Sequence, residues 1–216
     1  MRLLLLGASG PTGRILLGKA LEGGHHVTVL VRRTGAVRQW NSRVTEVTGD
    51  ATDETALRDV IPGNDAVLST LGPGKSFRSE IVSEAAAALV PAMSQSGVSR
   101  LIFLSAFGAG DTPSYASLPQ RLLYGTLLRK VLADKTVADR RLLQSGLDVT
   151  LVYPVLLSNG PAEGYSVGTD LRFRGLPRIS RADAANFMLA QLTDRTWSGR
   201  RVILAPPVDV SAALGA

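Results

Sequence analysis

Short apolar runs that end in glycine alternate with longer stretches of helical periodicity along most of the chain. Residues 3–6 are four leucines followed by Gly7, which is typical of a strand buried on both faces of a sheet. In residues 12–21 the apolar side chains recur at helical spacing, and Gly23 follows as a stop signal. The pattern predicts a strand, a tight turn and a helix at the beginning of the chain.

The same alternation continues to residue 153. The further strands expected are 27–31, 44–48, 66–71, 101–104, 149–153 and 201–204, and the further helices are 54–60, 79–96, 119–145 and 181–193. We expect Pro91 to bend or break its helix, and the helical stretch 119–145 to form two pieces. Alternating strands and helices favour an α/β fold, a doubly wound parallel sheet with helices on both faces. After Pro154 the pattern loosens, which predicts a small C-terminal lobe over the carboxyl edge of the sheet.

Length and composition fit one soluble domain. The chain has 216 residues, so we expect residues 1–208 to form a single domain and residues 209–216 a loosely ordered tail. There is no cysteine, which excludes disulfides, thiolate zinc sites and cysteine nucleophiles and fits a cytoplasmic protein. No segment approaches the roughly 20 apolar residues that span a bilayer, and the opening leucine run is too short for a signal peptide.

The net charge of +6 raises the question of a nucleic-acid partner. The arginines are dispersed, aromatic residues make up only 5% of the chain, and no run combines the two, so scattered surface charge with a few phosphate ligands is favoured. We therefore expect a small-molecule partner and no nucleic acid. His25 and His26 lack companion ligands, so no metal site is expected. The oligomeric state is left open.

The most informative motif is the segment Gly7-Ala8-Ser9-Gly10-Pro11-Thr12-Gly13, between the first strand and the first helix. One glycine allows the sharp turn, one allows close approach of a pyrophosphate, and one allows the helix to pack on the strand. The helix N-terminus then offers free N–H groups and the positive end of its dipole to phosphates. A glycine trio alone is a weak signal, but here the strand and helix that it requires are both expected.

The end of the second strand indicates which dinucleotide is bound. Enzymes that use NAD place a carboxylate about 20 residues beyond the glycines, where it binds the ribose 2′-hydroxyl. Here Arg32 lies 19 residues after Gly13 and is followed by Arg33. An arginine suits a 2′-phosphate, so NADP is the expected cofactor, and Arg38 can share the role.

Two further segments follow predicted strands at the edge where open α/β sheets bind ligands. Asp50 and Ala51 follow the third strand, where the carboxylate can accept the adenine amino group. Leu71 and Gly72 follow the fourth strand. Neither pair alone indicates a nucleotide site. Their order after a glycine motif makes them informative.

The chain resembles the atypical short-chain dehydrogenase/reductase superfamily. Within it, the chain is most similar to the NAD(P)H-binding group that includes biliverdin reductase B, a flavin reductase, and the NmrA-like proteins. The resemblance covers residues 1–204 and rests on the glycine segment and on Val29-Leu30-Val31-Arg32, Gly49-Asp50-Ala51, Leu71-Gly72, Leu104-Ser105-Ala106-Phe107, Ser145-Gly146-Leu147-Asp148-Val149-Thr150, Tyr153-Pro154 and Ile179-Ser180-Arg181-Ala182-Asp183.

The resemblance implies a role for each matching position. By this resemblance the pyrophosphate is held by Ser9, Gly10, Thr12 and Gly13, the 2′-phosphate by Arg32, and the adenine by Asp50 and Ala51. The ribose on the nicotinamide side is bound by Leu71, Gly72 and Lys135, and the nicotinamide ring lies against Pro154, Val155 and Leu156. Ser105, after the fifth strand, is the candidate catalytic residue beside the nicotinamide. Gly7, Pro11 and Arg33 complete the expected cofactor-binding set.

Two positions depart from the family pattern. The superfamily's catalytic tyrosine stands four residues before a lysine, and here Val131 has that place before Lys135. Leu156 stands where biliverdin reductase B has a substrate-pocket histidine, which argues against biliverdin as the substrate. We expect an NADPH-dependent reductase of a flat conjugated acceptor such as a flavin or quinone, with Ser105 donating a hydrogen bond to the acceptor or the carboxamide. Such acceptors can take their proton from water, so the missing tyrosine is compatible with this reaction. The alternatives are a non-catalytic NADP sensor of the NmrA type and a sugar-nucleotide epimerase, and the missing tyrosine and short C-terminal region argue against the epimerase.

Overall fold

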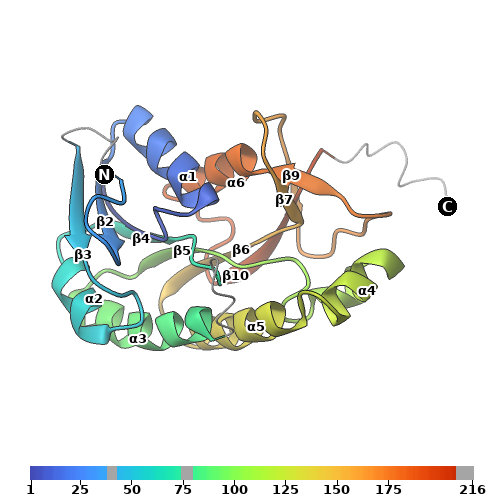
Figure 1. The fold of residues 1–216 in the computed structure, drawn as a ribbon, viewed down its shortest axis with the longest axis horizontal. Coiled ribbons are helices and arrows are strands. Elements are labelled where there is room, and N and C mark those ends of the chain that lie inside the picture. Colours follow the sequence, from blue (N-terminus) through green and yellow to red (C-terminus); the bar gives the residue numbers. More distant parts are fainter. Residues whose placement is uncertain (38–42, 74–79, 208–216) are drawn as a thin grey trace.

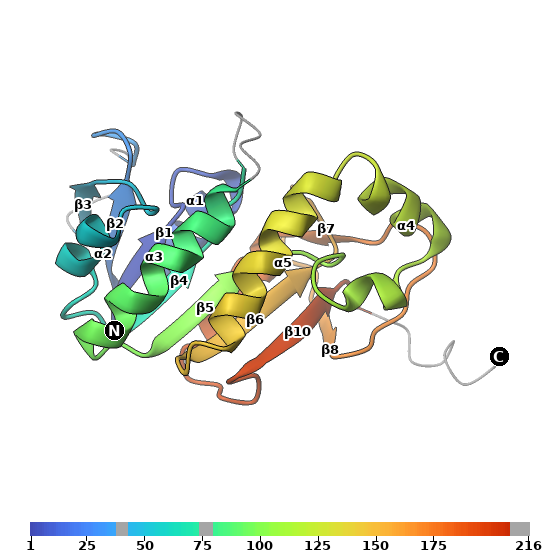
Figure 2. The ribbon, with the colours of Figure 1, turned by 90° about the horizontal axis from the view of Figure 1, so that it is seen from below.

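Eight strands form one central sheet in the computed structural model, which describes residues 1–37, 43–73 and 80–207. The strand order is β3-β2-β1-β4-β5-β6-β10-β8 (Figures 1 and 2). All neighbours are parallel except β8, which is antiparallel to β10. The strands of this sheet are β1 Arg2–Leu6, β2 His26–Val31, β3 Val44–Thr48, β4 Ala66–Ser69, β5 Arg100–Leu104, β6 Asp148–Pro154, β8 Ser166–Gly168 and β10 Arg200–Ala205.

Helices cover both faces of this sheet. α1 and α6 lie on one face, and α2, α3 and α5 lie on the other (Figures 1 and 2). The helices are α1 Pro11–Glu22, α2 Glu54–Val60, α3 Ile81–Ser96, α4 Leu118–Gly125, α5 Arg129–Leu143 and α6 Arg181–Ala190. The order β3-β2-β1-β4-β5-β6 is that of a dinucleotide-binding Rossmann fold. The predicted doubly wound α/β fold is therefore confirmed.

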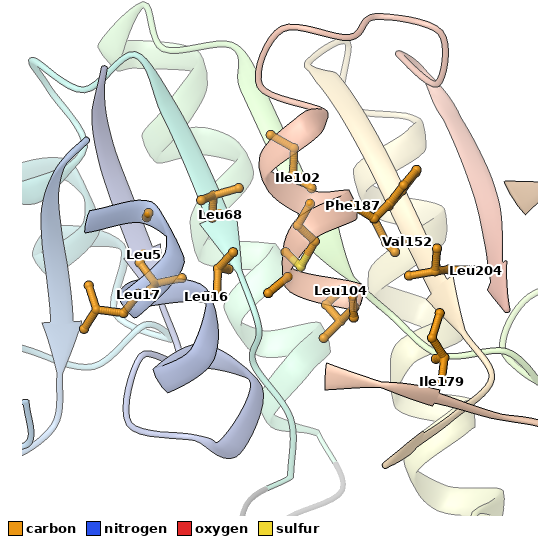
Figure 3. Close-up of a cluster of buried hydrophobic side chains, with 14 of the residues drawn as sticks. Leu5, Leu16, Leu17, Leu68, Ile102, Leu104, Val152, Ile179, Phe187 and Leu204 are labelled. Atoms are coloured by element: carbon orange, nitrogen blue, oxygen red, sulfur yellow. The ribbon is translucent and has the colours of Figure 1, made fainter. Parts of the chain in front are cut away.

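The leucine run of β1 explains why both faces must be covered. Leu3 and Leu5 belong to a buried cluster with residues of α1 and α6, of which Figure 3 draws a part. Leu4 and Leu6 belong to a second buried cluster with residues of α2, α3 and α5. Because successive side chains of a strand point to opposite faces, four leucines in a row require apolar partners on both sides.

Besides β10, which the pattern predicted at residues 201–204, the C-terminal segment forms three strands that it did not predict. β7 (Leu156–Ser158) pairs in parallel with β9 (Arg178–Ser180) as a separate two-stranded sheet. β8 and β10 instead extend the main sheet beyond β6. The strands β7, β8 and β9 are each only three residues long, which is too short for a periodicity to be recognised. That residues 1–208 are one domain stays a prediction, and the expected tail lies outside the described residues.

Several boundaries differ from the expected ones. β4 ends at Ser69, so Thr70 and Leu71 leave the sheet and become available to a site. Pro91 lies inside α3, which is one helix, so of the two expected effects of this proline, a bend or a break, the break is excluded. The helix continues because its flanking residues Leu89, Ala92 and Met93 are buried, and their packing offsets the cost of the proline.

The expected division of 119–145 into two helices is confirmed by α4 and α5. Among the described residues no helix has the length and apolar character needed to cross a membrane.

Replacing Gly13 by alanine should destabilise the fold. A Cβ atom at this position would lie 2.1 Å from the carbonyl oxygen of Gly7, a backbone contact that no rotamer change can relieve. We expect Gly13→Ala to lower the free energy of unfolding by about 1–3 kcal/mol, measured by urea denaturation. Gly125→Ala is the matched control, because nothing lies within 4 Å of the Cβ that it would add. Equal stabilities of the two variants would contradict this account of the packing.

Candidate functional site

A cavity of about 210 Å³ lies beside the turn between β1 and α1, and we name it the turn cavity. Its walls come from this turn, from the ends of β2 and β4, from the segment after β3, and from α3. The lining residues are Gly7, Ser9, Gly10, Pro11, Arg32, Asp50, Ala51, Thr70, Leu71, Gly72, Ile81 and Ala85. Nine of the residues predicted from the sequence to bind the cofactor, Gly7 among them, thus line one cavity.

The backbone of the turn is shaped for an anion. Gly7 has a φ of +81°, and the N–H of Gly10 donates to the Gly7 carbonyl at 3.0 Å. Gly10 is the N-cap residue of α1, where no side chain caps the helix, and the first turn contains no acidic residue. The first N–H groups of α1 therefore have no competing partner from a capping side chain and can bind a phosphate.

Gly13 has a different place from the other two glycines. It is buried and lines neither the turn cavity nor the second cavity described below, because it packs directly against the Gly7 carbonyl. It therefore serves the close packing of α1 on β1 that its spacing predicted, while Gly7 and Gly10 line the cavity.

The two charged side chains that line the turn cavity follow neighbouring strands. Arg32 is exposed directly after β2 and lines the cavity, whereas its neighbour Arg33, also exposed, does not. Asp50 follows β3, and its Oδ1 accepts two hydrogen bonds of 3.0 Å from the N–H and the hydroxyl of Thr52. These bonds fix the carboxylate in one orientation. Arg38, which the sequence offered as a second phosphate ligand, lies outside the described residues.

A second cavity of about 430 Å³ lies along the carboxyl edge of the sheet, and we name it the edge cavity. Thr70, Leu71 and Gly72 line both cavities, so the two adjoin at the end of β4. The other lining residues are Thr12, Pro73, Leu104, Ser105, Ala106, Phe107, Tyr124, Leu128, Val131, Leu132, Lys135, Pro154, Val155, Leu156, Leu157 and Arg181. Most of these side chains are apolar, which is typical of a pocket for an organic ligand.

Ser105 reaches the edge cavity from the end of β5 and is fixed from behind by Asp139. The Ser105 hydroxyl donates to Oδ2 of Asp139 at 2.6 Å, and the Tyr153 hydroxyl donates to the same oxygen at 2.7 Å. All three side chains are buried. Because the Ser105 proton is directed to Asp139, the hydroxyl oxygen offers lone pairs to the cavity.

Lys135 enters the cavity from α5 and is also fixed by the backbone. Its Nζ donates to the carbonyl of Leu104 at 3.0 Å. The neighbouring Asp134 is engaged elsewhere, because its carboxylate accepts from the N–H groups of Val82 and Ser83 at the start of α3. Lys135 and Asp139 are four residues apart on α5 and so lie on the same face of the helix.

Burial shifts the pKa of each ionisable group in this cluster. It lowers the pKa of Lys135, while the carboxylates of Asp139 and Asp134 oppose the shift. It raises the pKa of Asp139, against the hydrogen bonds from Ser105 and Tyr153 and the charge of Lys135. Burial also raises the pKa of Tyr153, together with the neighbouring Asp139. The second oxygen of Asp139, Oδ1, is buried without a hydrogen-bond partner. The cluster thus holds a carboxyl group for which ionisation is costly.

Three residues of the edge cavity and of the cluster behind it are functional candidates that the sequence did not indicate. Asp139 gave no signal except its spacing of four residues from Lys135. Tyr124 of α4 provides a phenol on the cavity wall, and burial raises its pKa to about 12, so it stays protonated at neutral pH. Arg181, the first residue of α6, lies inside the quoted segment 179–183, and its side chain donates to Oδ1 of Asn159 at 2.8 Å.

Comparison with known protein families and relatives also indicates a dinucleotide-binding chain. A family model described as NAD(P)H-binding matches residues 7–195 of the chain. A Bacillus subtilis protein named as an uncharacterized sugar epimerase, YhfK, is 27% identical over 210 residues, which are 93% of this chain and 92% of that protein. The family model covers most of the chain and confirms the NAD(P)H-binding family that the motifs predicted.

Two solved structures have the same fold as the chain. ChuY, an anaerobillin reductase from Escherichia coli, has a TM-score of 0.81 and 23% identity, with 96% of this chain and 98% of that chain covered. A short-chain dehydrogenase/reductase from Veillonella parvula, in complex with NADP, has a TM-score of 0.79 and 19% identity, with 95% of this chain and 94% of that chain covered. At these identities the likeness establishes the fold.

Replacing Asp139 should test the buried cluster. Asp139→Ala leaves the Ser105 and Tyr153 hydroxyls without their acceptor, and we expect it to lower the free energy of unfolding by about 2–4 kcal/mol. Asp139→Asn keeps an acceptor oxygen and should cost less. Chemical denaturation of both variants and the wild type provides the comparison.

The stability difference between wild type and Asp139→Asn should also depend on pH. Since the pKa of Asp139 is raised in the folded state, the folded protein binds this proton more tightly than the unfolded chain. The wild type is therefore most stable relative to Asp139→Asn below the pKa of an ordinary aspartate, and it loses this advantage as the pH rises through the raised pKa. A difference that grew with rising pH would contradict the assignment.

Proposed function

Since the chain belongs to the NAD(P)H-binding family, we propose that it is an NADPH-dependent reductase of a flat conjugated acceptor such as a flavin or quinone. The observation that carries this proposal is the pair of adjoining cavities, one beside the glycine turn and one at the carboxyl ends of β5 and β6. A dinucleotide that extends from the first into the second brings its nicotinamide next to a space where an acceptor can bind.

The residues of the turn cavity fit a dinucleotide. The uncapped start of α1 suits the pyrophosphate, and the fixed carboxylate of Asp50 can accept from the adenine amino group. Leu71 and Gly72, which line both cavities, are suited to the ribose between them, and Lys135 can donate to the same ribose. Pro154 and Val155 offer an apolar wall to the nicotinamide ring.

Arg32 favours NADP over NAD. It is the cation among the described residues that line the turn cavity, and it stands directly after β2, where an enzyme that uses NAD has the carboxylate that binds the 2′-hydroxyl. Its planar guanidinium can form two hydrogen bonds to phosphate oxygens. The described wall of the turn cavity therefore carries the charge that NADP requires.

Bound NADPH supplies the hydride, and the chain positions the acceptor. The apolar walls of the edge cavity exclude water from an acceptor and allow its ring to lie against the nicotinamide. Ser105 offers a fixed acceptor oxygen, because Asp139 holds its proton, and can thereby orient an N–H group of the carboxamide or of the acceptor. Flavins and quinones can take their proton from water, so the valine at position 131 is compatible with this reaction.

A non-catalytic NADP sensor is the second candidate. Val131 lines the edge cavity in place of the superfamily's tyrosine, and the hydroxyl of Ser105 is directed away from the cavity toward Asp139. A protein with these features can bind a dinucleotide without turning over an acceptor. Oxidation of NADPH that requires an added flavin or quinone distinguishes the reductase from the sensor.

Arg32→Ala should weaken the binding of NADPH selectively. We expect its Kd for NADPH to rise about tenfold and its Kd for NADH to change less than about twofold, because only NADPH has the 2′-phosphate. Calorimetric titration of both nucleotides measures the effect. Arg33→Ala is the matched control, as it removes the same charge from the neighbouring exposed position. An equal loss for both nucleotides, or a larger loss at Arg33, would rule out the role of Arg32.

Ser105→Ala should slow turnover without abolishing cofactor binding. We expect kcat/KM for a flavin or quinone acceptor to fall about 3–10-fold, the effect of one lost hydrogen bond. The assay follows NADPH oxidation with a panel of flavins and quinones. Unchanged turnover in the folded variant would exclude a role for this hydroxyl, and tight NADPH binding by the wild type with no turnover on any acceptor would favour the sensor.

A further inference from the structure

The edge cavity has two cationic residues on its apolar wall, Lys135 and Arg181, and none of its lining residues in the described part of the chain is acidic. A ligand held there meets positive charge that no carboxylate on the wall balances. Such a charge distribution attracts an anionic group, and it does so more strongly in an apolar cavity than in open water.

The two cations differ in how their charge is already engaged. Lys135 is buried, donates to the carbonyl of Leu104, and is attracted by the charges of Asp139 and Asp134. Arg181 donates to the neutral amide of Asn159, and none of the ion pairs formed within residues 1–37, 43–73 and 80–207 includes it. Arg181 is therefore the cation whose charge remains for a ligand.

The place of Arg181 in the fold directs it to the cavity. It is the first residue of α6 and follows β9, whose Ile179 packs in one cluster with Leu104 and Leu204 (Figure 3). Side chains on a helix lean toward its N-terminus, so Arg181 extends beyond the start of α6. Asn159, which follows β7, then holds the guanidinium at the cavity wall.

Arg181 also stands where a cation is electrostatically unfavourable. A positive charge in the first turn of a helix is repelled by the dipole, typically by about 0.3–1 kcal/mol. An anion bound to the guanidinium would interact favourably with both the arginine and the helix. The carboxylate of the same turn, Asp183, accepts from the N–H groups of Glu163 and Gly164 and from the Ser180 hydroxyl, so its hydrogen-bonding oxygens are engaged away from Arg181.

We propose that Arg181 binds an anionic group of the acceptor, a phosphate, carboxylate or sulfonate, while its flat ring occupies the apolar part of the edge cavity. The inference rests on the proposed reductase function and specifies its substrate class. It selects FMN over riboflavin, which has the same ring system and lacks the phosphate. It likewise selects a naphthoquinone sulfonate over the neutral naphthoquinone.

The test is a comparison of binding within these matched pairs, with NADP⁺ present so that no turnover is needed. We expect the wild type to bind FMN more tightly than riboflavin, by fluorescence titration. Arg181→Ala should weaken FMN binding about tenfold and change riboflavin binding less than about twofold, and Arg181→Lys should recover part of the preference. The preference should decrease as salt is raised.

Two controls separate this inference from other roles of the residue. Arg178→Ala removes the same charge from an exposed position of β9 that does not line the cavity, and it should leave the FMN preference intact. The Kd of each variant for NADPH should stay within about twofold of the wild type. A loss of NADPH binding in Arg181→Ala would assign the arginine to the cofactor and overturn the inference.

The remaining outcomes are also decisive. Equal weakening of FMN and riboflavin binding in Arg181→Ala, or no preference of the wild type for the anionic member of either pair, would overturn the inference. The reductase function is judged separately, from oxidation of NADPH by the neutral members riboflavin and naphthoquinone. Turnover of these without any preference refutes the anion site and retains the reductase, while an anion preference without turnover does the reverse.

Discussion

The contact between Gly13 and the carbonyl of Gly7 is the constraint on which the arrangement of the site depends. No side chain fits between them, so α1 starts directly against the end of β1. The end of β4 is drawn into the same place, because the backbone N–H of Thr70 donates to the carbonyl of Leu6 and its hydroxyl lies 3.2 Å from the carbonyls of Leu6 and Gly7. As a result, Thr70, Leu71 and Gly72 adjoin the glycine turn and continue into the edge cavity. One close packing contact therefore sets both the anion-binding end of α1 and the junction between the two cavities.

The parts of the fold that local pattern determines were predictable. The leucine run of β1 requires cover on both faces, and the glycine spacing requires a strand before it and a helix after it, so the doubly wound sheet follows from the first 30 residues and their repetition. The three-residue strands β7, β8 and β9 were not predictable, since they form only by pairing with strands that are distant in sequence or separate from the main sheet. The continuity of α3 through Pro91 likewise depends on tertiary packing that a local rule does not contain.

The same division applies to the site. The residues of the turn cavity follow the ends of strands, and parallel strands bring their carboxyl ends to one edge, so Arg32, Asp50 and Gly72 could be grouped from their order alone. Asp139 could not, because its partners Ser105 and Tyr153 come from β5 and β6, and nothing local marks a mid-helix aspartate as buried. The hydrogen bond that Ser105 donates to it could not be predicted either. A buried polar group is identified by what satisfies it, and that information is nonlocal.

The second cavity also bears on the choice between a reductase and a sensor. A sensor requires a dinucleotide site and a surface that changes on binding, and the turn cavity with the uncapped start of α1 is sufficient for the first of these. The edge cavity is larger, mostly apolar, and supported from behind by a hydrogen-bonded cluster that fixes Ser105. Burying Asp139 and Lys135 without a direct ion pair costs stability, since burial disfavours the charged form of each. For the proposed reductase, that cost is offset by a rigid wall that holds an acceptor against the nicotinamide. The placement of buried polar groups behind an otherwise apolar cavity therefore favours a site built to position a substrate.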